Sequence, residues 1–384
     1  MYALPEIEAF ADDLTALRRD FHAHPEIGFQ EHRTAAKVAE LLESWGVSVT
    51  RGIGGTGVVG VLDGSRPGRT IGLRADMDAL PMDEETNLPY ASKNPGVFHG
   101  CGHDGHTAIL LGAARYLAAH RDFAGRAVLI FQPAEEGLGG ARAMLKDGLF
   151  DRFPCDELYG LHNSPYLDFA ELRVRPGAAM AGASFFDIDI AGRGSHGAMP
   201  QASRDPIAIG AALVGELQQI VSRNMDPTHP AVVSVTQFQA GSAYNVIPAS
   251  ARLSGTFRFF QDADGEMIAR RIRQICAGLA AAHEVEITPD LSPVFSVLSN
   301  DPERAGNLID AARGLLGGKA RADADLTMGS EDMADLLRVV PGAFFTLGHA
   351  GDVPLHNPGF VFDDAILPVG ASLFATLVRT RGAA

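Results

Sequence analysis

Histidine, cysteine and aspartate are concentrated in residues 99–106, which read HGCGHDGH. Cys101 and His103 are two residues apart, a spacing that turns both side chains to one side of an extended or loop backbone. Thiolate and imidazole are ligands that suit Zn²⁺ and similar ions. Gly100 and Gly102 let the backbone turn so that both reach one centre. We therefore predict a metal site here, rather than a polar loop with incidental histidines.

Two adjacent carboxylates, Glu135 and Glu136, follow the apolar segment GRAVLIF in the motif FQPAEEG. Sheets of α/β proteins place their active sites at the carboxyl ends of such strands. Because neighbouring anions repel each other, we expect a cation beside them. One carboxylate can then bind metal while the other acts as a general base. The residues alone leave open which glutamate has which task.

Two further histidines extend the candidate ligand set. His162 ends a short apolar segment in YGLHN, and His356 lies in the proline-flanked loop VPLHNPGF. Together with Cys101, His103 and one glutamate they make a set of five. A single zinc ion commonly has about four ligands including water. Five protein ligands plus water therefore predict two ions that share a bridge.

A third group of polar residues lies in the middle of the chain. His196 stands in GRGSHGAMP, Asn245 in YNVIP and Arg258 in GTFRFF. A turn or strand explains each residue alone. On a lid that faces a metal site, they would bind a substrate carboxylate and carbonyl oxygen. We predict that all three bind substrate, with Arg258 holding the carboxylate and Asn245 supporting it.

Strand-like and helix-like segments alternate in the first half of the chain. Residues 56–64, 69–80 and 125–136 predict strands, and 31–45 and 107–120 predict helices. This alternation predicts an α/β fold with a central mixed, largely parallel sheet flanked by helices. Glycines in residues 52–57 match a dinucleotide motif, but a strand follows them instead of the required helix. We therefore interpret that stretch as a tight turn between strands.

From about residue 183 the pattern changes to a compact α+β unit with an antiparallel sheet and two helices. Helix–strand alternation returns after about residue 293, so the middle unit is predicted to be an insertion. The predicted boundaries are 1–181 and 294–384 for the two parts of the catalytic, metal-binding domain and 182–293 for the inserted domain.

Composition excludes several classes of protein. The chain of 384 residues carries 32 lysines and arginines against 47 acidic residues, a net charge of −15, without a basic run. A phosphate backbone would repel it, so we expect no nucleic-acid partner. No apolar run reaches the ~20 residues of a membrane span, and the first residues lack the pattern of a secretory signal. Three cysteines are too few for a disulfide framework, which favours the cytoplasm.

Motifs along nearly the whole chain resemble the hippurate hydrolase and N-acyl-amino-acid amidohydrolase family. That family belongs to the aminoacylase–carboxypeptidase superfamily of dinuclear metallopeptidases. The motifs, in order, are FHAHPEIGFQE, GLRADMDALPM, CGHDGHTA, FQPAEEG, GLHN, the His196 loop, GSEDM and LHNP.

The resemblance implies an assignment for each candidate residue. Glu135 is the catalytic carboxylate, and the metal ligands are Cys101, His103, Glu136, His162 and His356. The inserted domain is implied to be a lid or dimerisation domain in a homodimer or higher homo-oligomer, and His196 to complete the site of a partner subunit. The wider superfamily has a His-x-Asp motif where this chain has Arg74-Ala75-Asp76. Asp76 and Asp78 are therefore expected to support the ligands from behind.

We accordingly expect a metal-dependent amidohydrolase that cuts the amide bond of N-acyl-L-amino acids, such as hippurate-like compounds, N-acetyl amino acids or short dipeptides. The expected attacking group is a hydroxide on two divalent ions, Zn²⁺ or Mn²⁺ with Co²⁺ or Ni²⁺ as alternatives, and Glu135 is the general base. Two alternatives are a hydrolase with Cys101 as nucleophile and a non-catalytic metal-binding protein. The first leaves the glutamate pair unexplained, and the second needs no spare carboxylate.

Overall fold

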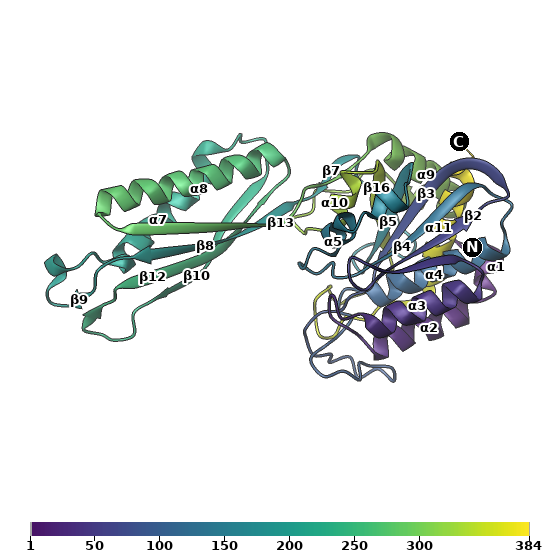
Figure 1. The fold of residues 1–384 in the computed structure, drawn as a ribbon, viewed down its shortest axis with the longest axis horizontal. Helices are drawn as coiled ribbons and strands as arrows, with labels where there is room; N and C mark the ends of the chain where they lie inside the picture. Colours follow the sequence, from purple (N-terminus) through teal and green to yellow (C-terminus); the bar gives the residue numbers. More distant parts are fainter. Residues whose placement is uncertain (1, 384) are drawn as a thin grey trace. The chain divides into compact units, whose positions relative to one another are not determined.

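The chain folds into two compact units in a computed structural model that describes residues 2–383 (Figure 1). Unit 1 contains the described residues up to Ala179, Ser299–Leu326 and the described residues from Glu331 onward. Unit 2 contains Met180–Leu298 together with Thr327–Ser330. The short return of residues 327–330 to unit 2 was not anticipated from the sequence, which assigned all of 294–384 to the catalytic domain.

Unit 1 is built on an eight-stranded sheet with the strand order β1-β2-β4-β3-β5-β16-β6-β15. Strand β3 pairs in parallel with β4 and β5, and β5 pairs in parallel with β16, whereas β1, β2 and β4 are joined by antiparallel pairing. The prediction of a mixed, largely parallel sheet is confirmed. The strands are β1 (Ser48–Ile53), β2 (Gly57–Asp63), β3 (Arg66–Asp76), β4 (Ala124–Gln132), β5 (Glu157–Ser164), β6 (Leu172–Arg173), β15 (Ala320–Arg321) and β16 (Gly342–Gly348).

Helices flank this sheet, as predicted. Helix α4 (His103–Ala119) packs against β3 and α11 (Leu367–Arg381), and α2 (Ala11–Ala23) packs against α4. Ile71, Leu73 and Ala75 of β3 belong to the apolar core that these helices share. The other helices of unit 1 are α1 (Pro5–Glu8), α3 (His32–Ser44), α5 (Gly140–Lys146), α6 (Leu149–Arg152), α9 (Pro302–Leu316) and α10 (Met333–Leu337), with short 3₁₀ turns at Gly317–Lys319 and Asp364–Ile366.

Two element boundaries differ from the sequence prediction. Helix α4 begins at His103 rather than at residue 107, because Gly102 adopts φ 91° and turns the chain directly into the helix. A Cβ at position 102 would lie 2.5 Å from Asn163 Oδ1, so only glycine fits there. Strand β4 ends at Gln132 and not at residue 136, because Pro133 has no N–H to continue the ladder.

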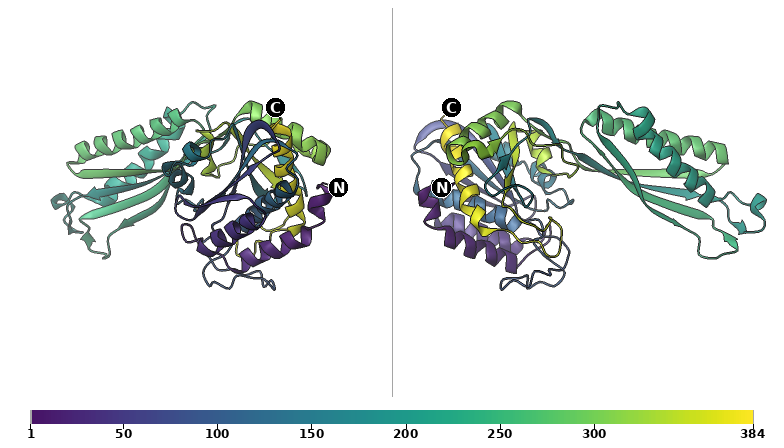
Figure 2. Two further views of the ribbon diagram at one scale, coloured as in Figure 1. Left: turned by 45° about the vertical axis from the view of Figure 1, so that its right-hand side comes forward. Right: turned by 180° about the vertical axis from the view of Figure 1, so that it is seen from behind.

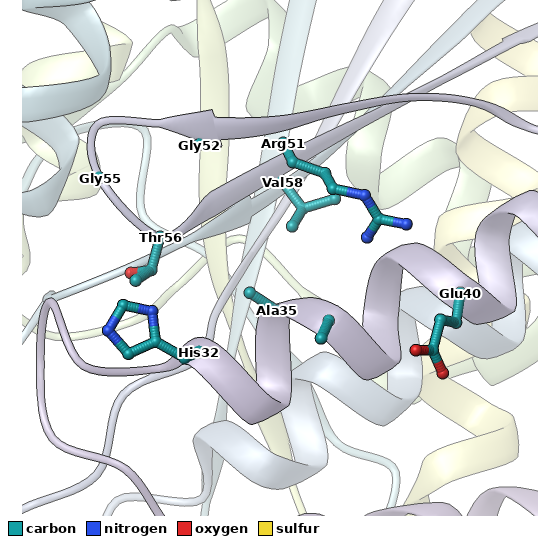
Figure 3. A pocket seen from close by; sticks show the side chains of 9 residues that line it. His32, Ala35, Glu40, Arg51, Gly52, Gly55, Thr56 and Val58 are labelled. Atoms are coloured by element: carbon teal, nitrogen blue, oxygen red, sulfur yellow. The ribbon is translucent and has the colours of Figure 1, made fainter.

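The glycine-rich stretch forms the turn that the sequence predicted. Strands β1 and β2 are antiparallel neighbours; Gly52 near the end of β1, and Gly54 and Gly55 in the turn between the strands, have positive φ. A hollow of about 370 Å³ is lined by residues of this hairpin and of α3, and Figure 3 shows the side chains that line it. No helix follows the glycines, so the phosphate-binding arrangement of a dinucleotide fold is absent here.

Unit 2 has a four-stranded antiparallel sheet in the order β10-β12-β8-β13 (Figure 2). Phe186, Ile188 and Ile190 alternate with more exposed residues along β8, and helices α7 and α8 cover their side of the sheet. The elements are β8 (Gly182–Ala191), β9 (Ser195–His196), α7 (Pro206–Gln219), β10 (Ala231–Ala240), β11 (Val246–Ile247), β12 (Ser250–Phe259), α8 (Asp262–His283) and β13 (Glu286–Phe295), with helical turns at Pro200–Ala202 and Ile220–Asn224.

The chain passes between the units beside a short ribbon of β7 (Gly177–Met180) and β14 (Leu298–Asn300). Because β13 continues to Phe295, unit 2 extends to Leu298, beyond the boundary of 293 that the sequence suggested. Across residues 2–383, no helix combines the length and apolar character of a membrane span.

Candidate metal centre and active site

The candidate ligands of unit 1 come from segments that meet at one edge of the sheet. His162 lies near the end of β5, Glu136 follows β4 and His356 follows β16. Cys101 and His103 stand at the start of α4. Because β4, β5 and β16 all run parallel to β3 or to each other, their carboxyl ends lie at the same edge. The structure thus brings together all five ligands that the resemblance implied.

Distances among their donor atoms are short. Cys101 Sγ lies 3.3 Å from His162 Nε2 and 3.3 Å from His356 Nε2. Glu136 Oε1 lies 3.3 Å from His356 Nε2 and 4.0 Å from His103 Nε2. Two groups of donor atoms within 4.8 Å of one another contain Cys101: Cys101 with His103 and His162, and Cys101 with Glu136 and His356. His103 also forms such a group with Glu135 and Glu136, and another with Asp76 and His106.

Neighbouring oxygens fix which ring nitrogen of each histidine faces the centre. His103 Nδ1 is 2.9 Å from the carbonyl oxygen of Asp78, and His162 Nδ1 is 2.7 Å from that of Asn163. A ring N–H that donates to a carbonyl leaves the Nε2 lone pair free for a metal ion. His103 Nε2 is buried without a hydrogen-bond partner in the described residues, and Glu136 Oε1 lies 4.0 Å from it. A buried polar atom is rarely left without a partner, so this nitrogen, with the carboxylate oxygen beside it, fits the donor set of a metal site.

The charges of the site also suit a cation. Hydrogen bonds with Cys101 and Glu136 raise the pKa of His356 to about 10. Burial, reinforced by His106 and His103, lowers the pKa of His162 to about 3, so this ring is neutral and can ligate. Burial raises the pKa of the Cys101 thiol. A reactive cysteine needs a lowered pKa, which counts against Cys101 as a nucleophile.

Glu135 is buried beside the candidate ligands: its carboxylate forms a group with His103 and Glu136, but belongs to neither of the two groups around Cys101. Burial, followed by the charges of Glu331 and Glu136, raises the pKa of its carboxyl well above the ordinary value. Its Oε1 accepts a long hydrogen bond of 3.4 Å from the backbone N–H of Asp332. A carboxylate in this setting can accept a proton from water that reacts at the neighbouring centre.

Glu135, Glu331 and Asp332 form a further group of carboxylates within 4.8 Å. The guanidinium of Arg74 already supplies a cation to this group. Its Nη2 lies 2.8 Å from Glu331 Oε1 and 3.2 Å from Asp332 Oδ1. We therefore do not assign a metal ion to it.

Two acidic residues support the segment that carries Glu135 and Glu136. Asp78 takes the supporting position expected of it: one oxygen accepts from Glu136 N at 3.0 Å, and the other lies 3.3 Å from His103 Nδ1. The carboxylate of Glu31 is completely buried and accepts from Ala134 N at 2.8 Å. Both anchor the loop that carries Glu135 and Glu136. No spacing rule could have identified Glu31, because its partner lies 103 positions away.

Unit 2 holds the three residues predicted to bind substrate, but it separates them. His196 of β9 pairs with Val246 of β11, and Gly197 N donates to the carbonyl oxygen of Asn245 at 2.7 Å. Arg258 pairs with Ala183, near the other end of the sheet. From Ser250 to Arg258, β12 spans about 26 Å at the usual rise of a strand. The two-stranded ribbon of β9 and β11, which carries His196 and adjoins Asn245, lies beyond the Ser250 end of β12. Asn245 therefore does not support Arg258 of the same chain.

Comparison with known proteins identifies the family. The sequence profile of peptidase family M20/M25/M40 matches residues 72–380. The chain belongs to this family. The hippurate hydrolase of Campylobacter jejuni is 42% identical over 378 residues, 98% of each chain. An N-acyl-L-amino acid amidohydrolase of Geobacillus stearothermophilus is 42% identical over 313 residues, 80% of this chain and 84% of the relative.

Solved structures of the M20 family agree. A Bacillus subtilis protein described as a dinuclear metal-binding peptidase of the M20 family superposes with a TM-score of 0.84 at 35% identity, covering 97% of this chain and 98% of that chain. Membership of the M20 family confirms the resemblance and the prediction of a metal-dependent hydrolase of the metallopeptidase type.

Proposed function

We propose that this M20 enzyme hydrolyses the amide bond of N-acyl-L-amino acids, such as hippurate-like compounds, N-acetyl amino acids or short dipeptides. The observation that carries the proposal is the pairing of a five-residue candidate ligand set with one further buried carboxylate, Glu135, which lies within 4.8 Å of donor atoms of His103 and Glu136 but in neither group around Cys101. A hydrolytic site needs such a base, whereas a closed structural metal site does not.

The residues around Cys101 fit two divalent ions, because Cys101 is common to both groups of donor atoms. When bound, such ions supply a Lewis-acid centre that polarises the amide carbonyl and lowers the pKa of water. Both thiolate and carboxylate donors are present, which suits Zn²⁺ or Mn²⁺ and also admits Co²⁺ or Ni²⁺.

Glu135 is the proton carrier in this proposal. It accepts a proton from the attacking water and donates it to the amine that leaves. Its position between the ligands and the backbone N–H of Asp332 fixes the carboxylate for both transfers. Positioned proton transfer of this kind typically contributes ~10² to 10⁴-fold in rate.

Arg258, His196 and Asn245 are the proposed substrate contacts. Because about 26 Å of strand separates Arg258 from the other two, one small substrate cannot touch all three in a single chain. We therefore propose that His196 and Asn245 act on the substrate of a second copy, in a homodimer or a larger homo-oligomer. Strand β10 supports this, because it is an edge strand with Val232 and Phe238 exposed. An unprotected edge of this kind can pair with another chain.

An assay on a panel of N-acetyl and N-benzoyl amino acids tests the proposed function. We expect turnover that disappears after chelation and returns when Zn²⁺ or Mn²⁺ is added. Short dipeptides are included as further candidate substrates, and esters of the same N-acyl amino acids, which lack the free carboxylate, serve as comparison substrates. Activity that survives chelation in protein shown by elemental analysis to be free of metal would contradict the proposal.

A further inference from the structure

Arg74 is a fully buried arginine at the centre of a polar network beside the catalytic carboxylate. Its Nη1 lies 2.7 Å from Asp76 Oδ2, and its Nε donates to Gln132 Oε1 at 2.9 Å. Its Nη2 donates to Glu331 at 2.8 Å and to Asp332 at 3.2 Å. One guanidinium therefore joins β3, the end of β4 and the segment before α10.

Asp332 is held from three directions. Besides Arg74, its Oδ1 accepts from Gln132 Nε2 at 2.7 Å, and its Oδ2 accepts from Ala141 N at 2.9 Å. Glu331 Oε1 accepts from Met333 N at 2.9 Å as well as from Arg74. Charge-assisted hydrogen bonds in a buried setting are the stronger kind and fix geometry. The backbone at residues 331–333 is therefore fixed by its own side chains.

This fixed backbone also contacts Glu135. The N–H of Asp332 donates to Glu135 Oε1, and Gln132, which ends β4, begins the short loop that carries Glu135. The network thus constrains the catalytic carboxylate from both sides: through the loop before it and through the donor in front of it. Without Arg74, three buried carboxylates within 4.8 Å would repel each other.

We propose that Arg74, Glu331 and Asp332 form a positioning clamp for Glu135. The clamp rests on the proposed function, in which Glu135 is the general base. Its members act through Glu135 and touch neither substrate nor metal. A displacement of about 1 Å in a catalytic group can cost on the order of 10²-fold in rate, so loosening the clamp lowers kcat.

Glu331→Gln is the principal variant, because an amide oxygen can still accept from Arg74 and Met333 while the charge is lost. We expect kcat to fall about tenfold in Glu331→Gln and about 10²-fold in Glu331→Ala, the range of one charge-assisted hydrogen bond. KM should change less than about threefold, because substrate contacts are untouched. Metal content by elemental analysis should equal that of the unmodified enzyme.

Glu157→Gln is the matched control. Glu157 is also fully buried and is held by Arg69 and Arg381, but it lies at the amino end of β5, away from the ligands. We expect it to lower Tm without changing kcat at a temperature where the protein is folded. If Glu331→Gln behaves in the same way, Glu331 is only structural and the clamp is refuted.

Hydrogen exchange gives a measure that does not depend on turnover. Peptides covering residues 331–337 should exchange faster in Glu331→Ala, because the Met333 N–H loses its acceptor and the Asp332 N–H loses its fixed position. Peptides covering residues 99–106 should exchange as before. Faster exchange in both regions would mean that the variant loosens the metal site as a whole, which contradicts a clamp.

A double-mutant cycle with Glu135→Asp separates the clamp from the proposed function. If the clamp acts through the carboxylate, Glu331→Gln should reduce kcat less in the Glu135→Asp enzyme than in the unmodified one. An equal fold-reduction of kcat by Glu331→Gln in the unmodified and the Glu135→Asp enzymes would overturn the clamp while leaving Glu135 as the base. Near-normal turnover of Glu135→Asp and Glu135→Gln alone would instead overturn the proposed function.

Discussion

At the scale of single residues, the adjacent glutamates 135 and 136 face different partners. Glu136 is held through its N–H by Asp78, and its Oε1 faces His356 and His103. Glu135 faces the backbone of Asp332 instead. Because neighbouring side chains leave a loop in different directions, one glutamate can ligate while the other carries protons.

Glu135→Gln should therefore lose turnover and keep metal. We expect kcat to fall by at least about 10²-fold, the usual contribution of a positioned base, because an amide cannot accept the proton. Elemental analysis should show unchanged metal content. Cys101→Ala is the opposite control: it should lose metal, because a donor common to both groups is removed. A Glu135→Gln enzyme with near-normal kcat would exclude Glu135 as the base.

The proposed ligands were recognisable in the sequence, and Asp78 was expected to support them, but the contacts of Arg74 and Glu331 were not predictable. Cys101, His103, Glu136, His162 and His356 have chemistries that stand out, and their motifs resemble a known family. Arg74 and Glu331 are 257 positions apart and have no unusual spacing. Only the folded chain shows that they meet, because a buried ion pair depends on tertiary contacts that no local pattern encodes.

At the scale of elements, the start of α4 places Cys101 and His103 on either side of Gly102. The φ of 91° and the nearby Asn163 Oδ1 allow no side chain at this position. The sequence prediction placed the helix start at Thr107 because it followed apolar periodicity, which the polar run before it does not show. A glycine in the left-handed conformation can start a helix without any apolar periodicity in the sequence before it.

Gly102→Ala should consequently destabilise the protein by about 2 kcal/mol or more and lower its metal content. Both ligands would have to move to relieve the overlap with Asn163. Gly96→Ala is the control, since Gly96 has φ 75° with open space around it and bears only the backbone cost. Thermal unfolding measures the loss of stability in both variants, and elemental analysis measures their metal content. Equal effects of the two substitutions would show that the contact with Asn163 is unimportant.

At the scale of the whole molecule, stability should depend on pH through His22. Burial alone would lower its pKa, but Asp104 and Glu84 raise it to about 9. Because the folded pKa exceeds the unfolded value of about 6.5, the stabilisation is fully present below pH 6.5 and is lost as the pH rises through 9. A shift of this size corresponds to about 3 kcal/mol at low pH.

We expect His22→Gln to lower the free energy of unfolding strongly at pH 6 and little at pH 10. Fluorescence of Trp45, the single tryptophan of the chain, reports the unfolding of unit 1 in urea. The exposed His32 provides a control, because His32→Gln removes no buried pair. A His22→Gln loss that is the same at both pH values would show that the charge of the ring is not responsible.

Assembly is testable by combining two inactive variants. If His196 acts on the partner subunit's substrate, a co-expressed mixture of His196→Ala and Glu135→Gln should recover about a quarter of normal activity. Random pairing makes about half of the dimers mixed, and each mixed dimer has one complete site. Mixed dimers verified by mass spectrometry but lacking activity would rule out this role of His196.

The insertion of one unit into another was visible in the sequence as a change of pattern near residue 183. The return of the chain to unit 2 at Thr327–Ser330 was not visible in the sequence, because this segment is too short to show any periodicity. Ala181 N lies 3.0 Å from the carbonyl oxygen of Thr327 and 3.1 Å from that of Gly329, which ties this segment to the start of unit 2. Local patterns describe elements of many residues, and a four-residue return depends on tertiary hydrogen bonds.

Because of the return of Thr327–Ser330, unit 2 cannot be removed from the chain as one continuous segment. An inserted domain with one exit and one re-entry can be excised or exchanged as a cassette. Here, removal of residues 180–298 would leave Thr327–Ser330 without the backbone that it pairs with, directly before Glu331. Chimeras between relatives should therefore exchange both segments together, and a fragment limited to 180–298 would lack part of its own fold.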